Sequence, residues 1–248
     1  YLSKEVEFRD VTDEIACFGV FGPKSRSLMS RLSKDDFSNE NFKFGTSKEI
    51  KINNKKIWAQ RLSYVGELGF ELYVKMDESK EIYNLIVDKG KELNLSHCGM
   101  FAMDTMRMEK GYLHWGHDMS PEENQYEAGL NFTISYKKNV DFVGKKALLK
   151  IQAQKPKKKF IMISLKDNKP GFPLLIHDEP ILCDGKIIGR TTSGNYSFNY
   201  KKNLAFGYVN SEQNLQGKDI EIEVEKVKYK GLIETRPLHD PDNKIIKQ

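Results

Sequence analysis

The most regular stretch of the chain alternates apolar and polar residues from Phe70 to Val74. Three apolar residues occupy the first, third and fifth positions, with Glu71 and Tyr73 between them. Side chains of a strand point alternately to its two faces, so this period of two predicts a strand that carries Glu71 and Tyr73 on one face. Two glycines within residues 66–69 predict a loop just before it.

The rest of the first part of the chain mixes short strands and helices. An apolar run from Ile15 to Phe21 predicts a strand, and the Asn-Asn-Lys-Lys sequence at 53–56 predicts a hairpin between two further strands. Other expected elements are helices at 28–32, 82–93, 102–110 and 147–151, and a strand at 132–136. This mixture predicts an α+β fold in which helices cover one face of a small antiparallel sheet.

The texture of the sequence changes after the lysine-rich run at 155–159. Short apolar runs separated by Gly, Pro and Asn follow it, at residues 160–165, 174–177, 187–188, 204–209, 220–224 and 229–233. Short strands at this spacing are typical of a compact antiparallel barrel or sandwich. We therefore predict two domains, residues 1–155 and residues 156–248.

The composition is that of an ordinary soluble globular protein. Of 248 residues, 30% are charged and 39% are hydrophobic, and the net charge is +5. No aromatic–basic module accompanies the lysines, so no nucleic-acid partner is expected, although a polyanionic ligand such as a polyglutamylated cofactor would suit the positive charge. No apolar run approaches the length of a membrane span, so no membrane partner is expected, and no signal peptide is visible.

Three cysteines, Cys17, Cys98 and Cys183, are far apart and lack the spacing of metal ligands. Cys17 and Cys183 lie in apolar, strand-like contexts, so both are expected to be reduced residues of the core. This usage favours a cytoplasmic protein, or one of the mitochondrial matrix if the source is eukaryotic. Because Tyr1 is not a start methionine and a strand pattern begins almost at once, we expect the chain to be a piece of a longer polypeptide.

Glu71 is a candidate ligand-binding residue on its sequence context alone. One interpretation is a charge on an edge strand that points to water, because carboxylates are seldom buried without a partner. The other is a carboxylate that accepts two hydrogen bonds from a planar N–H/NH2 edge, such as a pterin ring presents. A charged acceptor there would contribute about 1.5–3 kcal/mol. Tyr64, just before the loop, would approach Glu71 if the loop were a tight hairpin.

The run from His114 through His117 to Asp118 raises the question of a metal site. Zinc needs three or four converging ligands, and no second cluster of His or Cys supplies them, so no metal is predicted. Trp115 lies inside the run, where it could form an aromatic wall or fill core. The sequence contains no nucleophile elbow, P-loop or dinucleotide fingerprint.

Several runs taken together resemble one known family. They are FGVFGPKSRSLMSRL from Phe18, YVGELGFE from Tyr64, GMFAMDTMRMEKGYLHWGHDMSPEENQYEAGLNF from Gly99, VDFVGKKAL from Val140, IIGRTTSGNYS from Ile187 and RPLHDP from Arg236. The chain resembles the glycine cleavage T-protein (aminomethyltransferase) family over essentially its whole length. The resemblance is greatest to the folate-binding C-terminal region of dimethylglycine and sarcosine dehydrogenases.

This resemblance implies a set of folate-binding residues. Glu71 corresponds to the glutamate that ends the family's G-Y-T-G-E-x-G-F-E motif and binds the pterin ring, and Tyr64 corresponds to the tyrosine of that motif. Phe132 corresponds to the aromatic residue that closes over the ligand. Trp115 and Tyr196 lie in family motifs and are further candidates for ligand contact.

The sequence departs from the family pattern in two respects. Free T-proteins carry G-A-R-D-T-L-R, in which the first arginine contacts the folate. Met103 replaces that arginine here, which argues against free T-protein activity, and Arg107 keeps the second arginine, for which a structural role is open. The family also has an upstream region that supplies the catalytic aspartate, so no catalytic residue is expected within this chain.

For the whole molecule, the resemblance implies a ferredoxin-like antiparallel sheet with helices, followed by a small antiparallel β-barrel of the Greek-key or jelly-roll type. The implied activity is one-carbon transfer from a methylated amine or an aminomethyl donor to tetrahydrofolate, giving 5,10-methylene-tetrahydrofolate. FAD is expected only if a dehydrogenase domain is fused upstream. A lipoyl carrier protein or such a flavin domain would be the partner.

Two other functions stay open at this stage. The first is a stand-alone tetrahydrofolate-dependent demethylase that acts on another methyl donor, such as a sulfonium or an aryl ether. The second is a non-catalytic folate-binding or assembly module. A flavin domain upstream in the reading frame would favour the dehydrogenase type. A short upstream folate-binding region without a flavin fingerprint would favour the demethylase. Loss of the upstream aspartate would favour the non-catalytic module.

Overall fold

The structure is a computed structural model that describes residues 6–138, 140–166, 169–212, 215 and 218–248. By packing, the chain forms two compact units, one of residues 1–100 with 242–248 and one of residues 101–241. Each unit has its own sheet and its own core. The boundary predicted between residues 155 and 156 marks a change in the sequence pattern. The two units are defined by packing, so this boundary stays a prediction.

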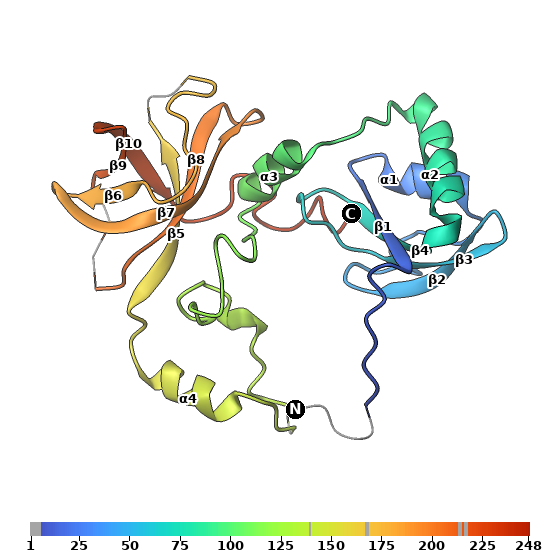
Figure 1. The fold of residues 1–248 in the computed structure, drawn as a ribbon, viewed down its shortest axis with the longest axis horizontal. Helices are drawn as coiled ribbons and strands as arrows, with labels where there is room; N and C mark the ends of the chain where they lie inside the picture. Colours follow the sequence, from blue (N-terminus) through green and yellow to red (C-terminus); the bar gives the residue numbers. More distant parts are fainter. Residues whose placement is uncertain (1–5, 139, 167–168, 213–214, 216–217) are drawn as a thin grey trace. The chain divides into compact units, whose positions relative to one another are not determined.

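The first unit is a four-stranded antiparallel sheet with two helices (Figure 1). Its elements are β1 (Ile15–Phe21), α1 (Ser25–Leu32), β2 (Ser47–Ile52), β3 (Lys55–Gln60), β4 (Gly69–Lys75), α2 (Met76–Gly90) and the short 3-10 helix η1 (Lys91–Leu93). The strands lie in the order β1-β4-β3-β2, so β4 is an inner strand. The predicted hairpin joins β2 to β3 through Asn53 and Asn54, at φ of 48° and 63°, a left-handed conformation that asparagine tolerates.

One face of this sheet is the core face. Phe70, Leu72 and Val74 of β4 are fully buried, as are Ile57 of β3 and Met29 of α1 in the same cluster. Both helices contact β4. The predicted alternation is therefore confirmed, because the apolar side chains of β4 face the helices and the polar ones lie on the opposite face.

The connection from β3 to β4, residues 61–68, is a packed loop and not a tight hairpin. Arg61 is 1% exposed, and its guanidinium donates to Asn39 Oδ1 at 2.5 Å and to the Phe42 carbonyl at 2.7 Å. Leu68 is buried, and its carbonyl accepts from the Ser25 hydroxyl at 3.0 Å. Neighbouring segments of the same unit thus fix the loop in place.

The second unit is a closed six-stranded antiparallel barrel together with the segment that precedes it (Figure 1). Its elements are α3 (Met100–Glu109), the 3-10 helix η2 (Asn131–Thr133), α4 (Lys145–Ala153), β5 (Lys158–Leu165), β6 (Pro180–Cys183), β7 (Lys186–Ser197), β8 (Lys202–Asn210), β9 (Ile220–Val224) and β10 (Val227–Glu234). The barrel closes in the order β10-β5-β8-β7-β6-β9. The predicted α+β class, with an antiparallel sheet, helices and a following barrel, is confirmed.

Two predicted strands are wrong. Residues 132–136 form the end of η2 and irregular backbone. The amides of Thr133 and Ile134 donate to the carbonyls of Leu130 and Asn131, so they need no hydrogen bonds from a neighbouring strand. Residues 174–177 are also irregular. There only Leu175 is buried, packed against the Gly194 position of β7, while Leu174 and Ile176 are exposed.

The cysteine prediction is half right. All three cysteines are free, and Cys183 is buried in the barrel. Cys17 is exposed, because it lies on the face of β1 that the helices do not cover, opposite Tyr73. Across the described ranges, no helix combines the length and the apolar character needed to cross a membrane.

Candidate functional site

Glu71 lies on the face of the first unit's sheet that is turned away from α1 and α2. Its cross-strand partners are Gly19 on β1 and Gln60 on β3, and it is partly buried. The interpretation of Glu71 as an edge-strand charge is wrong, because β4 pairs on both sides. This carboxylate lies on an inner strand, beside a glycine whose Cβ position the Phe21 ring occupies, and it stays partly accessible on this face of the sheet.

A hydrogen bond holds the Glu71 carboxylate from one side. The Tyr73 hydroxyl donates to Glu71 Oε2 at 2.8 Å, and Cys17 is the cross-strand neighbour of Tyr73. The bond to Glu71, with burial, raises the pKa of Tyr73 well above its ordinary value. Partial desolvation by its neighbours on the sheet, together with the nearby charge of Glu71, raises the pKa of Cys17. The tyrosine therefore stays a protonated donor, and the cysteine stays a thiol, near neutral pH.

Aromatic side chains flank this carboxylate. The Phe21 ring lies across the Gly19 and Gly69 positions, where added Cβ atoms would meet it at 2.6 and 2.3 Å. Trp58 is the cross-strand partner of Tyr73 and is 48% exposed. The face thus offers a charged hydrogen-bond acceptor between flat apolar surfaces, which is the chemistry that a planar heterocycle with N–H donors requires.

The other predicted site residues divide between the two units. Tyr64 lies, partly buried, in the connection from β3 to β4 of the first unit. Trp115, Phe132 and Tyr196 belong to the second unit, where Trp115 is 63% and Phe132 79% exposed, and Tyr196 is partly buried in β7. That these residues meet Glu71 in one cavity stays a prediction.

Arg107 of α3 ties that helix to the barrel. Its side chain is 1% exposed; Nε donates to Asp104 Oδ1 at 2.7 Å, and Nη2 donates to Ser193 Oγ of β7 at 2.9 Å. Nη1 donates to the Tyr112 carbonyl at 3.1 Å and pairs with the Asp118 carboxylate. Each N–H-bearing nitrogen of the guanidinium thus has a partner inside the second unit, which gives Arg107 a structural role.

Asp118, the last residue of the histidine-containing run, is also part of this network. Its side chain is fully buried, and Oδ1 accepts from Thr192 Oγ1 at 2.6 Å and from Ser193 Oγ at 2.7 Å. The rings of His114 and His117 stack on each other at 4.7 Å. Within the described part of the chain, no three His, Cys, Asp or Glu side chains are placed to hold a metal ion.

Sequence reasoning left a structural role open for Arg107 but missed this network. Glu109, at the end of α3, accepts from Ser197 Oγ and Asn199 Nδ2, both at 2.7 Å. The signal was present in part, since the runs that carry the family resemblance contain Arg107, Glu109 and Ser197. The barrel residues that bind Arg107 and Glu109 lie more than eighty positions after them in the chain, however, so only the fold reveals that they join α3 to the barrel.

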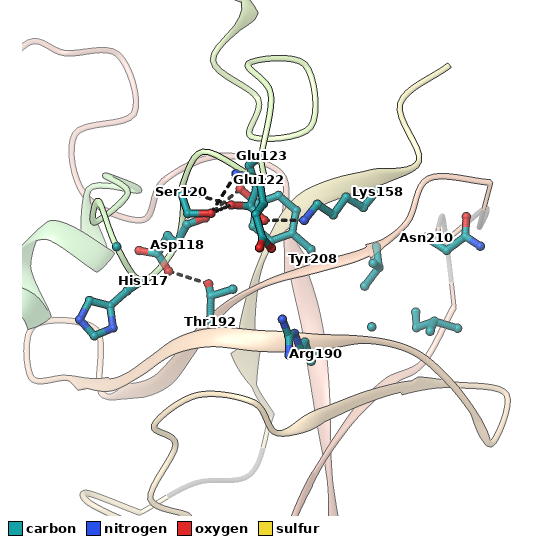
Figure 2. A pocket seen from close by; sticks show the side chains of 14 residues that line it. His117, Asp118, Ser120, Glu122, Glu123, Lys158, Arg190, Thr192, Tyr208 and Asn210 are labelled. Carbon is teal, nitrogen blue, oxygen red and sulfur yellow. Dashed lines mark hydrogen bonds and ion pairs between the residues drawn. The ribbon is translucent and has the colours of Figure 1, made fainter. Parts of the chain in front are cut away.

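A pocket of about 380 Å³ lies in the second unit between residues 116–123 and strands β7 and β8 (Figure 2). Several of its polar groups bind one another: Lys158 pairs with Glu123, Ser120 donates to Glu123 at 2.7 Å, and Thr192 donates to Asp118. These paired donors and acceptors have less hydrogen-bonding capacity left for a ligand. The open sheet face around Glu71 is the better candidate site.

Comparisons with known proteins bear on this site. Residues 1–138 match the family model of the GCVT N-terminal domain, and residues 158–240 match that of the glycine cleavage T-protein C-terminal barrel domain. The mitochondrial dimethylglycine dehydrogenase of Homo sapiens is 36% identical over 236 residues, which are 94% of this chain and 27% of that protein. An aminomethyltransferase of Symbiobacterium thermophilum is 30% identical over 235 residues, 94% of this chain and 62% of that protein.

A solved structure agrees on the fold. The glycine cleavage system aminomethyltransferase T from Bartonella henselae matches with a TM-score of 0.79 at 19% identity, covering 92% of this chain and 60% of that one. The chain thus spans about a quarter of the length of its dehydrogenase relative and about three fifths of its aminomethyltransferase relatives.

Proposed function

The chain belongs to the glycine cleavage T-protein family, and from this we propose that it is the tetrahydrofolate-binding part of an enzyme that transfers one-carbon units. The observation that carries the proposal is Glu71, a partly buried carboxylate on an inner strand whose open face is flanked by aromatic rings. A pterin ring combines a flat apolar body with an N–H/NH2 edge, and this face provides a partner for each.

The hydrogen bonds of Glu71 leave room for such a ligand. An ionised carboxylate has about four lone-pair sites, and the Tyr73 hydroxyl occupies one of them on Oε2. The remaining sites can accept both donors of a pterin edge. Charged hydrogen bonds of this kind are the stronger class, so Glu71 would supply orientation as well as affinity.

Aromatic residues are the further proposed ligand contacts. Phe132 and Trp115 present most of their apolar surface to water, and ligand contact would remove some of that surface from solvent. Tyr64 and Tyr196 are the further proposed contacts. All of these residues bind and position, so we assign no proton-transfer role to this chain.

Bound tetrahydrofolate would supply the nitrogens that take up a one-carbon unit from a methylated amine or an aminomethyl donor. The protein's contribution is to hold the reactants in near-attack geometry, which can replace about 7–11 kcal/mol of the barrier. Identity is higher to dimethylglycine dehydrogenase than to aminomethyltransferase, and Met103 stands where free T-proteins carry a folate-contacting arginine. We therefore favour a methylated amine as the donor and a flavin domain, with its FAD, as the partner over a lipoyl carrier.

Calorimetric titration with tetrahydrofolate under anaerobic conditions tests the proposal. It compares this chain and its full reading frame with the same proteins carrying Glu71→Gln. Glu49→Gln is the matched control, because Glu49 is the cross-strand partner of Trp58 and lies on the same sheet face, on the edge strand β2. We expect Glu71→Gln to weaken binding about ten- to hundredfold, the range of a lost charged hydrogen bond. Glu49→Gln should bind like the parent protein.

Two results would overturn the proposal. Equal affinity of the parent protein and Glu71→Gln would show that this carboxylate does not hold the pterin. Absence of binding to the full reading frame would show that the protein has no folate site. Binding by the full reading frame but not by this chain would instead show that the site needs residues outside positions 1–248.

A further inference from the structure

Tyr73 shares one face of β4 with Glu71, and its side chain leans back along the strand onto that carboxylate. Its hydroxyl donates to Glu71 Oε2 at 2.8 Å. On β1, Cys17 is the cross-strand partner of Tyr73 and Gly19 is that of Glu71. The carboxylate thus has a phenol on one side and, on the neighbouring strand, a glycine whose Cβ position the Phe21 ring occupies.

This arrangement limits the freedom of Glu71. A glutamate side chain at a partly open surface samples several rotamers, and ordering a long side chain on ligand binding costs up to about 2 kcal/mol. A hydrogen bond that is already made in the free protein removes part of that cost before the ligand arrives. The phenol is suited to this task, because it is neutral and its raised pKa keeps its proton in place near neutral pH.

The packing around Tyr73 is equally specific. The ring lies between its cross-strand partners Cys17 and Trp58 on the same sheet face. Loss of its hydroxyl alone would leave the aromatic ring in place. The hydroxyl and the ring can therefore be tested separately. Tyr73→Phe removes the hydroxyl alone, and the midpoint of thermal unfolding reports whether the ring stays packed.

We propose that Tyr73 is a positioning residue, which holds the Glu71 carboxylate ready for the N–H/NH2 edge of a bound pterin. The inference rests on the proposed function, since it assigns the residue that prepares that same site. It assigns Tyr73 no contact with the ligand. It predicts that the effect of the hydroxyl on folate affinity exists only while residue 71 is a glutamate.

A double-mutant cycle measures this dependence. Tetrahydrofolate affinity is determined for the parent protein, Tyr73→Phe, Glu71→Gln and the double variant, all in the full reading frame. We expect Tyr73→Phe to weaken binding about tenfold, corresponding to about 1.4 kcal/mol. The same substitution in the Glu71→Gln background should change the affinity less than twofold. Cys17→Ala, which removes the other neighbour of the hydroxyl, serves as the matched control and should bind within about twofold of the parent.

A second readout separates positioning from structural damage. Midpoints of thermal unfolding for the four proteins should agree within a few degrees, because Tyr73→Phe keeps the ring packed. With a tetrahydrofolate analogue whose 2-amino group is replaced by methyl, the loss caused by Tyr73→Phe should shrink, because that edge offers Glu71 one donor fewer.

The outcomes distinguish the inference from the function on which it rests. Parent-like binding by Tyr73→Phe, together with weak binding by Glu71→Gln, overturns the role of Tyr73 and leaves the pterin site standing. An equal loss from Tyr73→Phe in both backgrounds shows that the hydroxyl does not act through Glu71, and also overturns it. Parent-like binding by Glu71→Gln overturns the proposed site and this inference together.

Discussion

Replacing Arg107 with methionine is expected to destabilise the second unit by about 3 kcal/mol. The side chains of Arg107 and Asp118 are 1% and 0% exposed, so the substitution leaves a carboxylate buried without its cation. Removing one partner of a buried ion pair costs about 3–5 kcal/mol. Thr192, Ser193 and the His114 amide still donate to Asp118, which places the expected loss at the lower end of that range.

The measurement must report on the second unit alone, because two compact units need not unfold together. The chain has two tryptophans, and Trp58→Phe leaves Trp115 of the second unit as the fluorescent reporter. Urea unfolding followed at Trp115 then gives the free energy of that unit. Arg190→Met is the matched control: its side chain is 72% exposed and pairs with Asp178 at 3.1 Å, so its loss should cost less than about 1 kcal/mol.

A double variant makes the reasoning sharper. Adding Asp118→Asn to Arg107→Met removes the stranded charge, so the double variant should lose less than the sum of the two single losses. If Arg107→Met unfolds within about 1 kcal/mol of its parent, or if the two losses simply add, the buried pair does not join α3 to the barrel in the way described.

Two further predictions concern titrating groups. Partial desolvation and the charge of Glu71 raise the pKa of Cys17, so Glu71→Gln should increase the thiolate fraction at pH 8 and speed alkylation of Cys17 but not of Cys98. Mass spectrometry of the labelled peptides measures both rates, and an unchanged Cys17 rate refutes the coupling. Burial opposes ionisation of Glu123, but hydrogen bonds from Lys158 and Ser120 lower its pKa overall, so the stabilisation that they give is present above the ordinary pKa and is lost as pH falls through the folded value. Lys158→Met should therefore cost about 1 kcal/mol at pH 7 and nothing near pH 3 in urea unfolding, and an equal cost at both pH values contradicts this account.

The sequence pattern alone predicts much of the local structure. The alternation around Glu71 determines that strand β4 exists and that Tyr73 shares its face, because a strand has a fixed period of two. The asparagine pair determines the turn between β2 and β3, since few other residues accept its left-handed backbone. The local pattern wrongly predicted a strand at residues 174–177. That apolar run forms no paired strand there, and only Leu175 is buried.

Only the tertiary structure decides which strands lie side by side and which side chains are hydrogen-bonded to each other. Glu71 is interior to the sheet because β1, which lies some fifty positions earlier, pairs with β4 on the side away from β3, and no local pattern specifies that neighbour. Arg107 is buried because Ser193 of β7 and Asp118 converge on it. The sequence by itself predicted which residues could bind a planar ligand, Glu71 from its chemistry and its period and the others from the family resemblance. Long-range packing decided which of them are held in place, because burial and hydrogen-bond geometry depend on contacts between distant segments.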